Sequence, residues 1–318
     1  MKYRQFGRLG WDVSVVSFGG GGISGEGGGY GFGHINENDA VELVRAAQDA
    51  GITLFDTAPF YGYGTSEARI GKALEGERRQ RAIIVSKCGI TWDAGKRVQL
   101  DNSAKTTARM LHQSLRDLRT DYIDLYLVHW PDKNTDIRVT MEVLARAQEA
   151  GKVRAVGLSN TTPEEIALAR EITEIEGFQA QYNLFDRGVE EAILPYAKET
   201  DTGFMCWGPL HKGILTGRVV AGRTYDEVDA RRRAPWWKKA DHTPQLEAVA
   251  ALRPEVEAAG HSLLQLALGH VLEDPAMTTA LCGVRNRAQL ESAVNAVDNL
   301  PPADLLAYAR DIAAKAPL

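Results

Sequence analysis

Ionisable side chains end three successive predicted strands, and a phenol follows the first of them. The stretch 53–69, TLFDTAPFYGYGTSEAR, ends an apolar run in Asp56 and carries Tyr61 in the turn that follows. The next two predicted strands end in Lys87 and His129. Each alone has an ordinary explanation: a capped turn, a lysine that reaches solvent, a satisfied core histidine. Together they favour an active site, because barrel enzymes place their active sites at the carboxyl ends of the strands.

These positions depend on a regular alternation of short β-rich runs and longer amphipathic helices. The predicted strands are 16–18, 53–56, 82–87, 123–129, 155–159, 180–182, 203–207 and 278–282, after a hairpin over 3–6 and 12–15. The predicted helices are 37–50, 66–74, 103–118, 139–150, 163–172, 189–199, 262–273 and 287–297, with one more from residue 301. Eight alternating units without a linker predict one α/β domain over residues 1–318. Its expected fold is a (β/α)8 TIM barrel with an N-terminal β-hairpin and a C-terminal extra helix.

Local signals support the helix boundaries, and one segment breaks the pattern. Asn36 and Asp39 have the spacing of a helix cap, and Gly51 and Gly151 stand where a C-terminal glycine belongs. Residues 208–243 form a connection far longer than the usual few residues, and such loops are functional or disordered.

Composition and charge exclude several classes of protein. The formal net charge is −5 and the isoelectric point about 5.9, which argues against a general binder of nucleic acid or anionic membranes. The three cysteines are far apart and form no CxxC pair, so neither a disulfide framework nor a cysteine zinc site is expected, and no metal site is predicted. The N-terminus has no apolar signal segment, and no apolar run approaches the ~18 residues of a membrane span. We therefore expect a cytoplasmic protein.

Two segments imitate binding motifs. Gly20-x-Gly22-x-x-Gly25, within the glycine-rich loop 19–33, matches the dinucleotide fingerprint GxGxxG after a strand, but no helix is predicted before residue 37. A flexible loop at the barrel mouth is the preferred interpretation. The run RRRAPWWKK (231–239) interleaves aromatic and basic residues, yet one short run in an acidic chain is usually a solvated face. We expect it to form a lid, with Trp236 or Trp237 as a substrate wall.

Six motifs carry a resemblance that covers nearly the whole chain: FDTAPFYGYGTSE, VSKCG, DYIDLYLVHWPD, GKVRAVGLSN, FQAQYNLF and WGPLHKGILTGR. The chain resembles the aldo-keto reductase superfamily, in particular its bacterial general reductase and aldose dehydrogenase-like branch. The resemblance implies a (β/α)8 barrel and reversible hydride transfer between NADP(H) and a carbonyl.

By this resemblance Asp56, Tyr61, Lys87 and His129 fall on the catalytic tetrad of the family. Hydride addition to a carbonyl creates an alkoxide, so a proton donor must stand beside the oxygen, and Tyr61 takes that role. A phenol has a pKa of about 10, and a neighbouring Lys87 cation lowers it. Asp56 holds Lys87 through a charge-assisted hydrogen bond. His129 orients the substrate oxygen, while Tyr63 serves as loop packing or substrate wall.

The resemblance also implies a cofactor site. Ser159, Asn160 and Gln181 would hold the nicotinamide carboxamide, Trp207 would lie against its ring, and the loop from Gly208 to Arg218 would wrap the pyrophosphate. The full set of predicted cofactor residues is Gly19, Gly20, Asp56, Ser159, Asn160, Gln181, Trp207, Gly208, Pro209, Leu210, Gly213, Leu215, Arg218, Gly283, Arg285 and Gln289.

The segment around the adenosine departs from the family pattern. Gly283, Arg285 and Gln289 match the residues that hold the 2′-phosphate, but Ser292 and Ala293 stand where many members have Glu-Asn. We therefore expect a preference for NADP(H) with NAD(H) also usable.

Three hypotheses remain from the sequence. The first is an NADP(H)-dependent oxidoreductase acting on an aldehyde, a ketone or an aldose, in either direction. The second is a cofactor-binding regulatory subunit of the same fold with weak turnover, like the channel β-subunits. The third, a Rossmann dehydrogenase, needs a helix at Gly25. The expected partner is a small carbonyl or sugar substrate, without nucleic acid or membrane, and the oligomeric state is not predicted.

Overall fold

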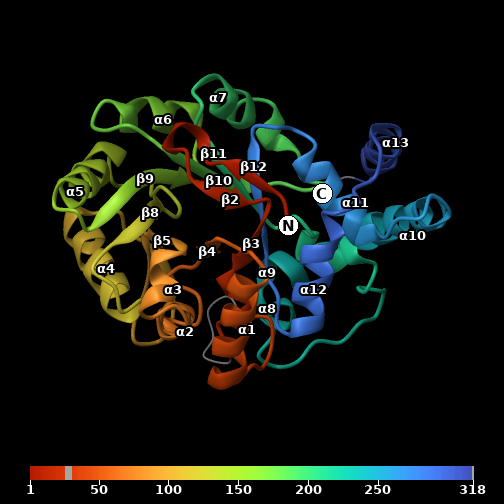
Figure 1. Ribbon diagram of the computed structural model, residues 1–318, viewed down its shortest axis with the longest axis horizontal. Coiled ribbons are helices and arrows are strands. Elements are labelled where there is room, and N and C mark those ends of the chain that lie inside the picture. The colour runs from red at the N-terminus through yellow and green to blue at the C-terminus, as the bar shows by residue number, and fades with distance from the viewer. Residues whose placement is uncertain (26–30, 317–318) are drawn as a thin grey trace.

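The computed structural model describes residues 1–25 and 31–316, and within them eight parallel strands close into a barrel (Figure 1). Around the barrel the order is β10-β11-β12-β3-β4-β5-β8-β9. Their bounds are β3 (Val16–Gly19), β4 (Leu54–Asp56), β5 (Ile83–Cys88), β8 (Ile123–Val128), β9 (Val153–Ser159), β10 (Gly177–Gln181), β11 (Gly203–Trp207) and β12 (Met277–Cys282). The predicted barrel is confirmed; the assignment of all 318 residues to one domain stays a prediction.

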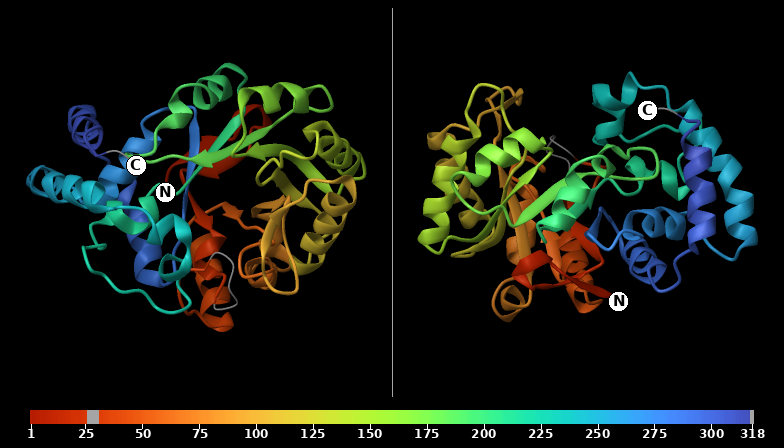
Figure 2. Two further views of the ribbon diagram at one scale, coloured as in Figure 1. Left: turned by 180° about the vertical axis from the view of Figure 1, so that it is seen from behind. Right: turned by 90° about the horizontal axis from the view of Figure 1, so that it is seen from above.

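Helices surround the barrel, as the views from behind and from above also show (Figure 2). They are α1 (Glu37–Asp49), α2 (Thr65–Ala73), the short α3 (Glu77–Gln80), α4 (Ala104–Asp117), α5 (Ile137–Glu149), α6 (Pro163–Arg170), α7 (Ile193–Glu199), α11 (Leu263–Leu272) and α12 (Arg287–Ala296). Three short 3-10 helices lie in the connections between these elements: η1 (Gly7–Leu9), η2 (Gly20–Ile23) and η3 (Gly188–Glu190). None of the helices among the described residues is long and apolar enough to cross a bilayer.

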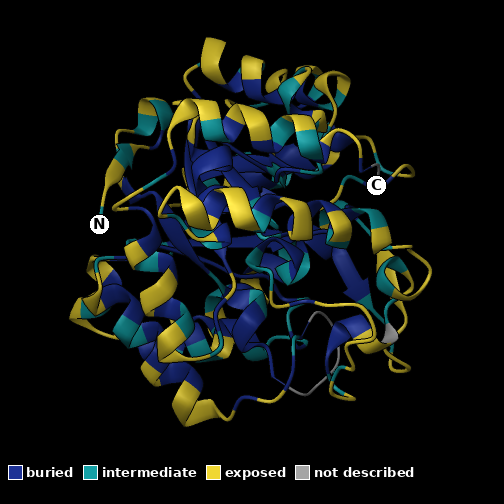
Figure 3. Ribbon diagram, turned by 90° about the vertical axis from the view of Figure 1, so that its right-hand side faces the viewer, coloured by how far each residue is buried: buried dark blue, intermediate teal, exposed yellow. Residues whose placement is uncertain are grey.

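Side-chain alternation along the strands creates two apolar layers. In β5, Val85 points into the barrel with Leu54 and Leu125, whereas Ile84 points outward toward the helices. This follows from the two-residue period of a strand. Figure 3 shows the consequence: the barrel strands are mostly buried, and the surrounding helices carry exposed residues on their outer faces. A side chain in the barrel wall therefore faces either the interior and the mouth or the layer of helices.

The predicted helix ends are confirmed at two equivalent junctions. Gly51 has φ of 92° and Gly151 has φ of 71°, a left-handed conformation that glycine adopts without a steric penalty. At the other end of α1, Asn36 accepts a hydrogen bond of 2.9 Å from the backbone N–H of Asp39. These two junctions lead directly into β4 and β9, so they help to fix where those strands begin and end.

The N-terminal hairpin closes the end of the barrel opposite the strand carboxyl ends. It consists of β1 (Tyr3–Gln5) and β2 (Asp12–Ser14), which pair antiparallel. Phe6 follows β1, is fully buried, and packs so tightly against Gly203 that a β-carbon there would lie 2.2 Å from its ring. The carboxyl ends of the strands are left to form the site.

Sequence reasoning misses two pieces of regular structure. After β5 an antiparallel hairpin forms from β6 (Ile90–Trp92) and β7 (Val98–Leu100). The helix α10 (Thr243–Ala258) contains Pro254, a residue that normally breaks helices, but its ring lies on the exposed face. Together with α13 (Ala303–Ala313), the predicted extra helix, α10 forms a second apolar cluster outside the barrel (Figure 1).

The predicted long loop 208–243 contains short helical pieces: η4 (His211–Thr216), α8 (Ala230–Arg233) and α9 (Pro235–Lys238). It is therefore neither a plain loop nor a further barrel unit.

Candidate active site

A buried ion pair joins two of the predicted residues inside the barrel mouth. Nζ of Lys87 lies 2.6 Å from Oδ1 of Asp56 and donates a second hydrogen bond of 2.8 Å to the backbone oxygen of Thr57. Lys87 is fully buried and Asp56 is 3 % exposed. Burial lowers the pKa of the Lys87 ammonium, and the charge of Asp56 acts against that shift. The pair holds a cation where water scarcely reaches.

Gln179 also binds Asp56 and was not among the predicted residues. Its Nε2 donates a hydrogen bond of 2.8 Å to Oδ1 of Asp56, the same oxygen that accepts from Lys87. Gln179 and Gln181 lie two residues apart on β10 and so point to the same side of the strand. The sequence signal that could have identified Gln179 is this spacing, which places two glutamines on the inward face of one barrel strand.

The turn after β4 carries Tyr61 over this ion pair. The backbone N–H of Tyr61 donates to Ala58, and its backbone oxygen accepts from the N–H of Ser66 at the start of α2. Nζ of Lys87 lies 5.1 Å from the centre of the Tyr61 ring. Tyr61 is half-buried, so its ring lies beside a buried cation without being sealed from solvent.

His129 completes the group of four, one residue beyond the end of β8. Its ring lies edge-on to Tyr61, with centroids 5.9 Å apart and planes at 88°. Burial, with a smaller contribution from the charge of Lys87, holds the pKa of His129 well below its usual range. The imidazole is therefore neutral near pH 7 and presents one N–H donor. The structure thus brings Asp56, Tyr61, Lys87 and His129 together, as the sequence predicts.

The polar residues predicted for the nicotinamide lie next to this group. Asn160 has φ of 53° and donates hydrogen bonds of 2.9 Å to the backbone oxygen of His129 and to Oγ of Ser159. Its Oδ1 accepts a hydrogen bond of 3.0 Å from the indole N–H of Trp207. Gln181 pairs with Trp207 across β10 and β11. These four side chains form one edge of the mouth.

The segment predicted to wrap a pyrophosphate follows β11. Gly208 and Gly213 have φ of 69° and 99°, and the backbone oxygen of Gly208 accepts a hydrogen bond of 3.1 Å from Asn183. Leu215 is buried in the second apolar cluster, so only its backbone is available to a ligand. Arg218 is exposed. Pro209 and Leu210 lie between the strand end and η4.

The glycine-rich loop packs against the start of η2 and the end of β12. A β-carbon on Gly19 would lie 3.1 Å from the backbone nitrogen of Gly283, and one on Gly20 would lie 2.6 Å from the backbone oxygen of Asp56. After β3 comes the 3-10 turn η2, and the next α-helix in the described residues is α1. Among the described residues, no helix follows Gly25 before α1, so the structure gives the dinucleotide fingerprint no support. Residues 26–30 of the predicted flexible loop lie outside the described residues.

Arg285 and Gln289 meet at the end of β12. The side-chain oxygen of Gln289 accepts a hydrogen bond of 2.9 Å from the backbone N–H of Arg285. Nη1 of Arg285 donates to the backbone oxygen of Phe32, and burial lowers the pKa of this half-buried guanidinium. Arg285 therefore links the end of β12 to the glycine-rich loop at Phe32.

The long connection crosses to the same loop. Asp229 forms a bridge with Phe32, and Arg231 binds Asp229 with an Nη2–Oδ2 distance of 2.7 Å. Both side chains of this ion pair are buried. Trp237 stacks on His242 at 4.0 Å, and its partly buried ring packs against the second apolar cluster. Whether either tryptophan meets a substrate stays a prediction.

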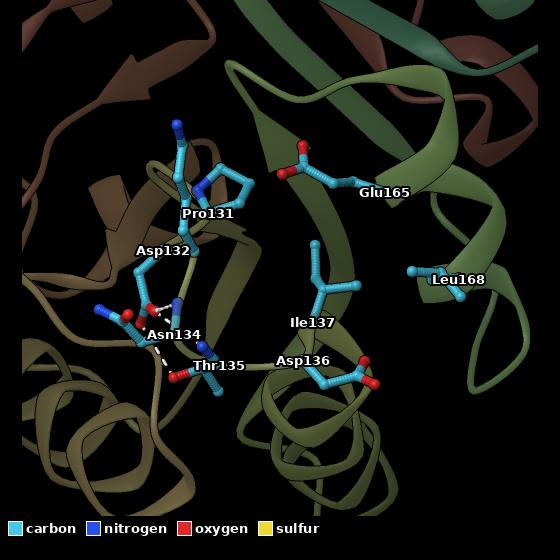
Figure 4. A pocket seen from close by; sticks show the side chains of 9 residues that line it. Pro131, Asp132, Asn134, Thr135, Asp136, Ile137, Glu165 and Leu168 are labelled. Carbon is cyan, nitrogen blue, oxygen red and sulfur yellow. Dashed lines mark hydrogen bonds between the residues drawn. The ribbon is translucent and has the colours of Figure 1, made fainter.

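Two further surfaces lie near the mouth. Tyr63 packs against Trp92 of the β6–β7 hairpin with ring centroids 4.9 Å apart and planes inclined at 53°, which supports its predicted role in loop packing. Figure 4 shows a separate depression of about 310 Å³ lined by residues 131–137, Glu165 and Leu168. In it, Asp132 accepts hydrogen bonds from the backbone N–H groups of Asn134 and Thr135. None of the predicted site residues lines this depression as the structure describes it.

The family model described as "Aldo/keto reductase family" matches residues 16–312. The chain belongs to the aldo/keto reductase family. Members of this family are oxidoreductases that use nicotinamide cofactors and act on small carbonyl substrates.

Three relatives illustrate the range within this aldo/keto reductase family. "Aldo-keto reductase YhdN" of Bacillus subtilis (strain 168) is 37 % identical over 294 residues, covering 92 % of this chain and 87 % of the relative. The "NADH-specific methylglyoxal reductase" of Escherichia coli (strain K12) is 29 % identical over 285 residues, covering 86 % and 87 %. The structure of the glycerol dehydrogenase AKR11B4 from Gluconobacter oxydans has a TM-score of 0.87 at 30 % identity, covering 99 % of this chain and 96 % of that one.

The two positions that depart from the family pattern have different environments in this aldo/keto reductase. The Ser292 hydroxyl donates a hydrogen bond of 2.7 Å to the backbone oxygen of Ala288 in its own helix. Ala293 is 3 % exposed and packs in the core. Only position 292 therefore faces away from the core.

Proposed function

We propose that this protein transfers hydride reversibly between a nicotinamide cofactor and an aldehyde, ketone or aldose, with Tyr61 as the proton donor. The observation that carries the proposal is the buried Lys87–Asp56 pair beside the rings of Tyr61 and His129. A buried cation next to a phenol has a direct chemical use, because it lowers the pKa of that phenol.

The residues around the mouth fit a nicotinamide dinucleotide. Asn160 and Gln181 offer amide donors and acceptors that suit a carboxamide, and Trp207 offers an aromatic face. The backbone around Gly208 and Gly213 makes left-handed turns, a conformation in which N–H groups can bind an anion, although the N–H of Gly213 itself donates to the backbone oxygen of Leu210. When bound, the reduced nicotinamide supplies the hydride that is added to the carbonyl carbon.

The chain's own residues provide the proton and the orientation. The Tyr61 hydroxyl donates a proton to the carbonyl oxygen as negative charge develops there, and it accepts the proton back in oxidation. Lys87 stabilises the resulting phenolate, and Asp56 with Gln179 keeps Lys87 in place. The neutral His129 donates a hydrogen bond that holds the carbonyl oxygen near Tyr61.

The choice of cofactor rests on Arg285. Its guanidinium is half-buried beside Phe32, and a planar fork of donors suits a 2′-phosphate. We propose NADP(H) as the preferred cofactor with NAD(H) usable, since one relative is named as NADH-specific and Ala293 offers no polar contact.

The three buried, unpaired cysteines agree with a reducing cytoplasm as the location.

The proposal is tested by a spectrophotometric screen of aldehydes, ketones and aldoses with NADPH and NADH in both directions. We expect turnover of at least one small aldehyde such as 4-nitrobenzaldehyde with NADPH. Cofactor binding without turnover of any compound in either direction would contradict the proposal and favour a regulatory subunit.

A further inference from the structure

A second buried carboxyl lies behind the strand that carries Lys87. Glu67 sits in the first turn of α2, six residues after Tyr61, and is fully buried. Its Oε1 accepts a hydrogen bond of 2.6 Å from Oγ of Ser86, the residue before Lys87 in β5. Because strand side chains alternate, Ser86 faces the helices while Lys87 faces the barrel mouth. Glu67 and Lys87 therefore flank the same strand from opposite sides.

Glu67 is only partly satisfied in this position. Its Oε2 has no hydrogen-bond partner among the described residues, which is costly for a buried carboxylate. Burial raises the pKa of Glu67 to about 7, whereas Ser86 and Ser114 favour its charged form. The Ser114 hydroxyl lies 3.4 Å from the Tyr126 hydroxyl.

The ionisable groups that act electrostatically on Glu67 come from three elements. Lys87 of β5 favours the charged form of Glu67, and Asp117 of α4 opposes it. Tyr126 of β8 is fully buried and stays protonated, because burial raises its pKa well above the usual value. Lys87 is thus the one cation in this group, acting from the opposite side of β5, and the charge of Glu67 in turn favours the ammonium form of Lys87.

We propose that Glu67 is a positioning residue that exchanges a proton behind the barrel wall and, through the charge of Lys87, controls how readily Tyr61 ionises. The inference rests on the proposed function, since it assigns Glu67 to the same proton-transfer group. Ionised Glu67 stabilises the Lys87 cation, and that cation stabilises the Tyr61 phenolate. At a pH where Glu67 is protonated, Lys87 depends on Asp56 alone.

The test reads Tyr61 directly and needs no turnover. The tyrosinate absorbance of each chain is titrated with pH, and the same titration of its Tyr61→Phe counterpart is subtracted. In Glu67→Gln, Lys87 loses a stabilising charge, so we expect the Tyr61 midpoint to rise by at least about half a pH unit. In a Lys87→Met background, Glu67→Gln should not raise the Tyr61 midpoint, because the lysine that transmits the effect of Glu67 is absent.

The sign of the shift separates this proposal from its competitor. Direct repulsion between Glu67 and the phenolate predicts a lower midpoint in Glu67→Gln, and an unchanged midpoint indicates that Glu67 only ties α2 to β5. Either result overturns the proposal. Asp117→Asn is the matched control, since it removes a half-exposed carboxylate from the same cluster and should shift Tyr61 much less.

Two further measurements test directly whether Glu67 exchanges a proton. The infrared carbonyl band of a protonated carboxylic acid should disappear between about pH 5 and about pH 9 in the native chain and be absent in Glu67→Gln. Ser86→Ala should move this transition to higher pH, because the charged form loses its hydrogen bond. If no carbonyl compound is turned over although the Tyr61 shift and the band are found, the proposed function fails while the Glu67 coupling stands.

Discussion

Lys87 and Asp56 form a 2.6 Å ion pair that is almost sealed from solvent, although they lie on neighbouring strands 31 residues apart. Taking two charges out of water is costly, and such pairs often add little to stability. An apolar pair of the same volume would pack there at no such cost. The pair is therefore better explained by the cation it keeps beside Tyr61 than by the stability it adds.

Replacing Tyr61 by Phe should lower carbonyl reduction by at least about 100-fold, because the general acid is lost. Binding of NADPH should be nearly unchanged, because the proposed mechanism assigns the hydroxyl to the carbonyl substrate and not to the cofactor. Steady-state kinetics and cofactor titration measure the two effects. Tyr63→Phe is the control and should be mild, since Tyr63 packs on Trp92. Near-native turnover in Tyr61→Phe would refute the mechanism.

Lys87→Met should abolish activity near pH 7, and Asp56→Asn should be severe but less complete. Asp56→Asn leaves a buried ammonium without its partner, so it should also cost roughly 3–5 kcal/mol of unfolding free energy. The double variant Asp56→Asn/Lys87→Met removes both charges. It should recover much of the unfolding free energy that Asp56→Asn loses, but it should remain inactive. Urea unfolding and initial rates give the comparison. A fully active double variant would show that the pair is structural.

Gln179→Leu should weaken the same arrangement without removing a charge. Asp56 would keep Lys87 but lose the hydrogen bond from the glutamine side chain. We expect a smaller loss of kcat than in Asp56→Asn, with KM for the carbonyl little changed. A loss confined to KM would instead place Gln179 at the substrate.

Arg285→Ala should weaken NADPH binding by about 10- to 150-fold and affect NADH little, since a charge-assisted hydrogen bond is worth roughly 1.5–3 kcal/mol. The difference should shrink at high salt. Quenching of tryptophan fluorescence measures both affinities, with Trp207 as the expected reporter. Arg287→Ala, which removes an exposed arginine two residues away, is the control. Equal losses for both cofactors would mean that Arg285 stacks on the adenine.

Glu67 should make the native chain less stable as pH rises. Its pKa is raised from 4.5 to about 7, so the folded state binds more protons than the unfolded state between these values. The contribution of Glu67 to the free energy of unfolding is then fully present below about pH 4.5 and is lost as pH rises through about 7. Relative to Glu67→Gln, the free energy of unfolding should fall by on the order of 3 kcal/mol across this range.

Urea unfolding of both chains across this range measures the difference. His211 and His270, whose pKa values burial lowers to about 3 and about 4, contribute the opposite slope, but they do so in both chains and cancel. Parallel stability curves would show that Glu67 does not titrate as described.

The sequence by itself determined the barrel and the position of its four ionisable groups. Alternating strand and helix patterns locate the strand ends, and the ends of parallel strands in a closed barrel must meet at one mouth. Asp56, Lys87 and His129 could therefore be placed together before any contact was known. The misses, α10 and the β6–β7 hairpin, have different causes. Pro254 signals a helix break, but it lies on the exposed face of α10 and the helix continues past it. The two hairpin strands have three residues each, too few to show a periodic pattern.

Only the tertiary structure decided which partner each group has. Gln179 reaches Asp56 across 123 residues, and the buried Glu67 meets Ser86 rather than water. Arg231 joins the long connection to the loop at Phe32 through Asp229. These contacts depend on how far each strand is shifted along its neighbour and on which side each side chain faces. Residue type and spacing identify the chemical groups, but burial and the nearest charge set their pKa values, and both are properties of the folded chain.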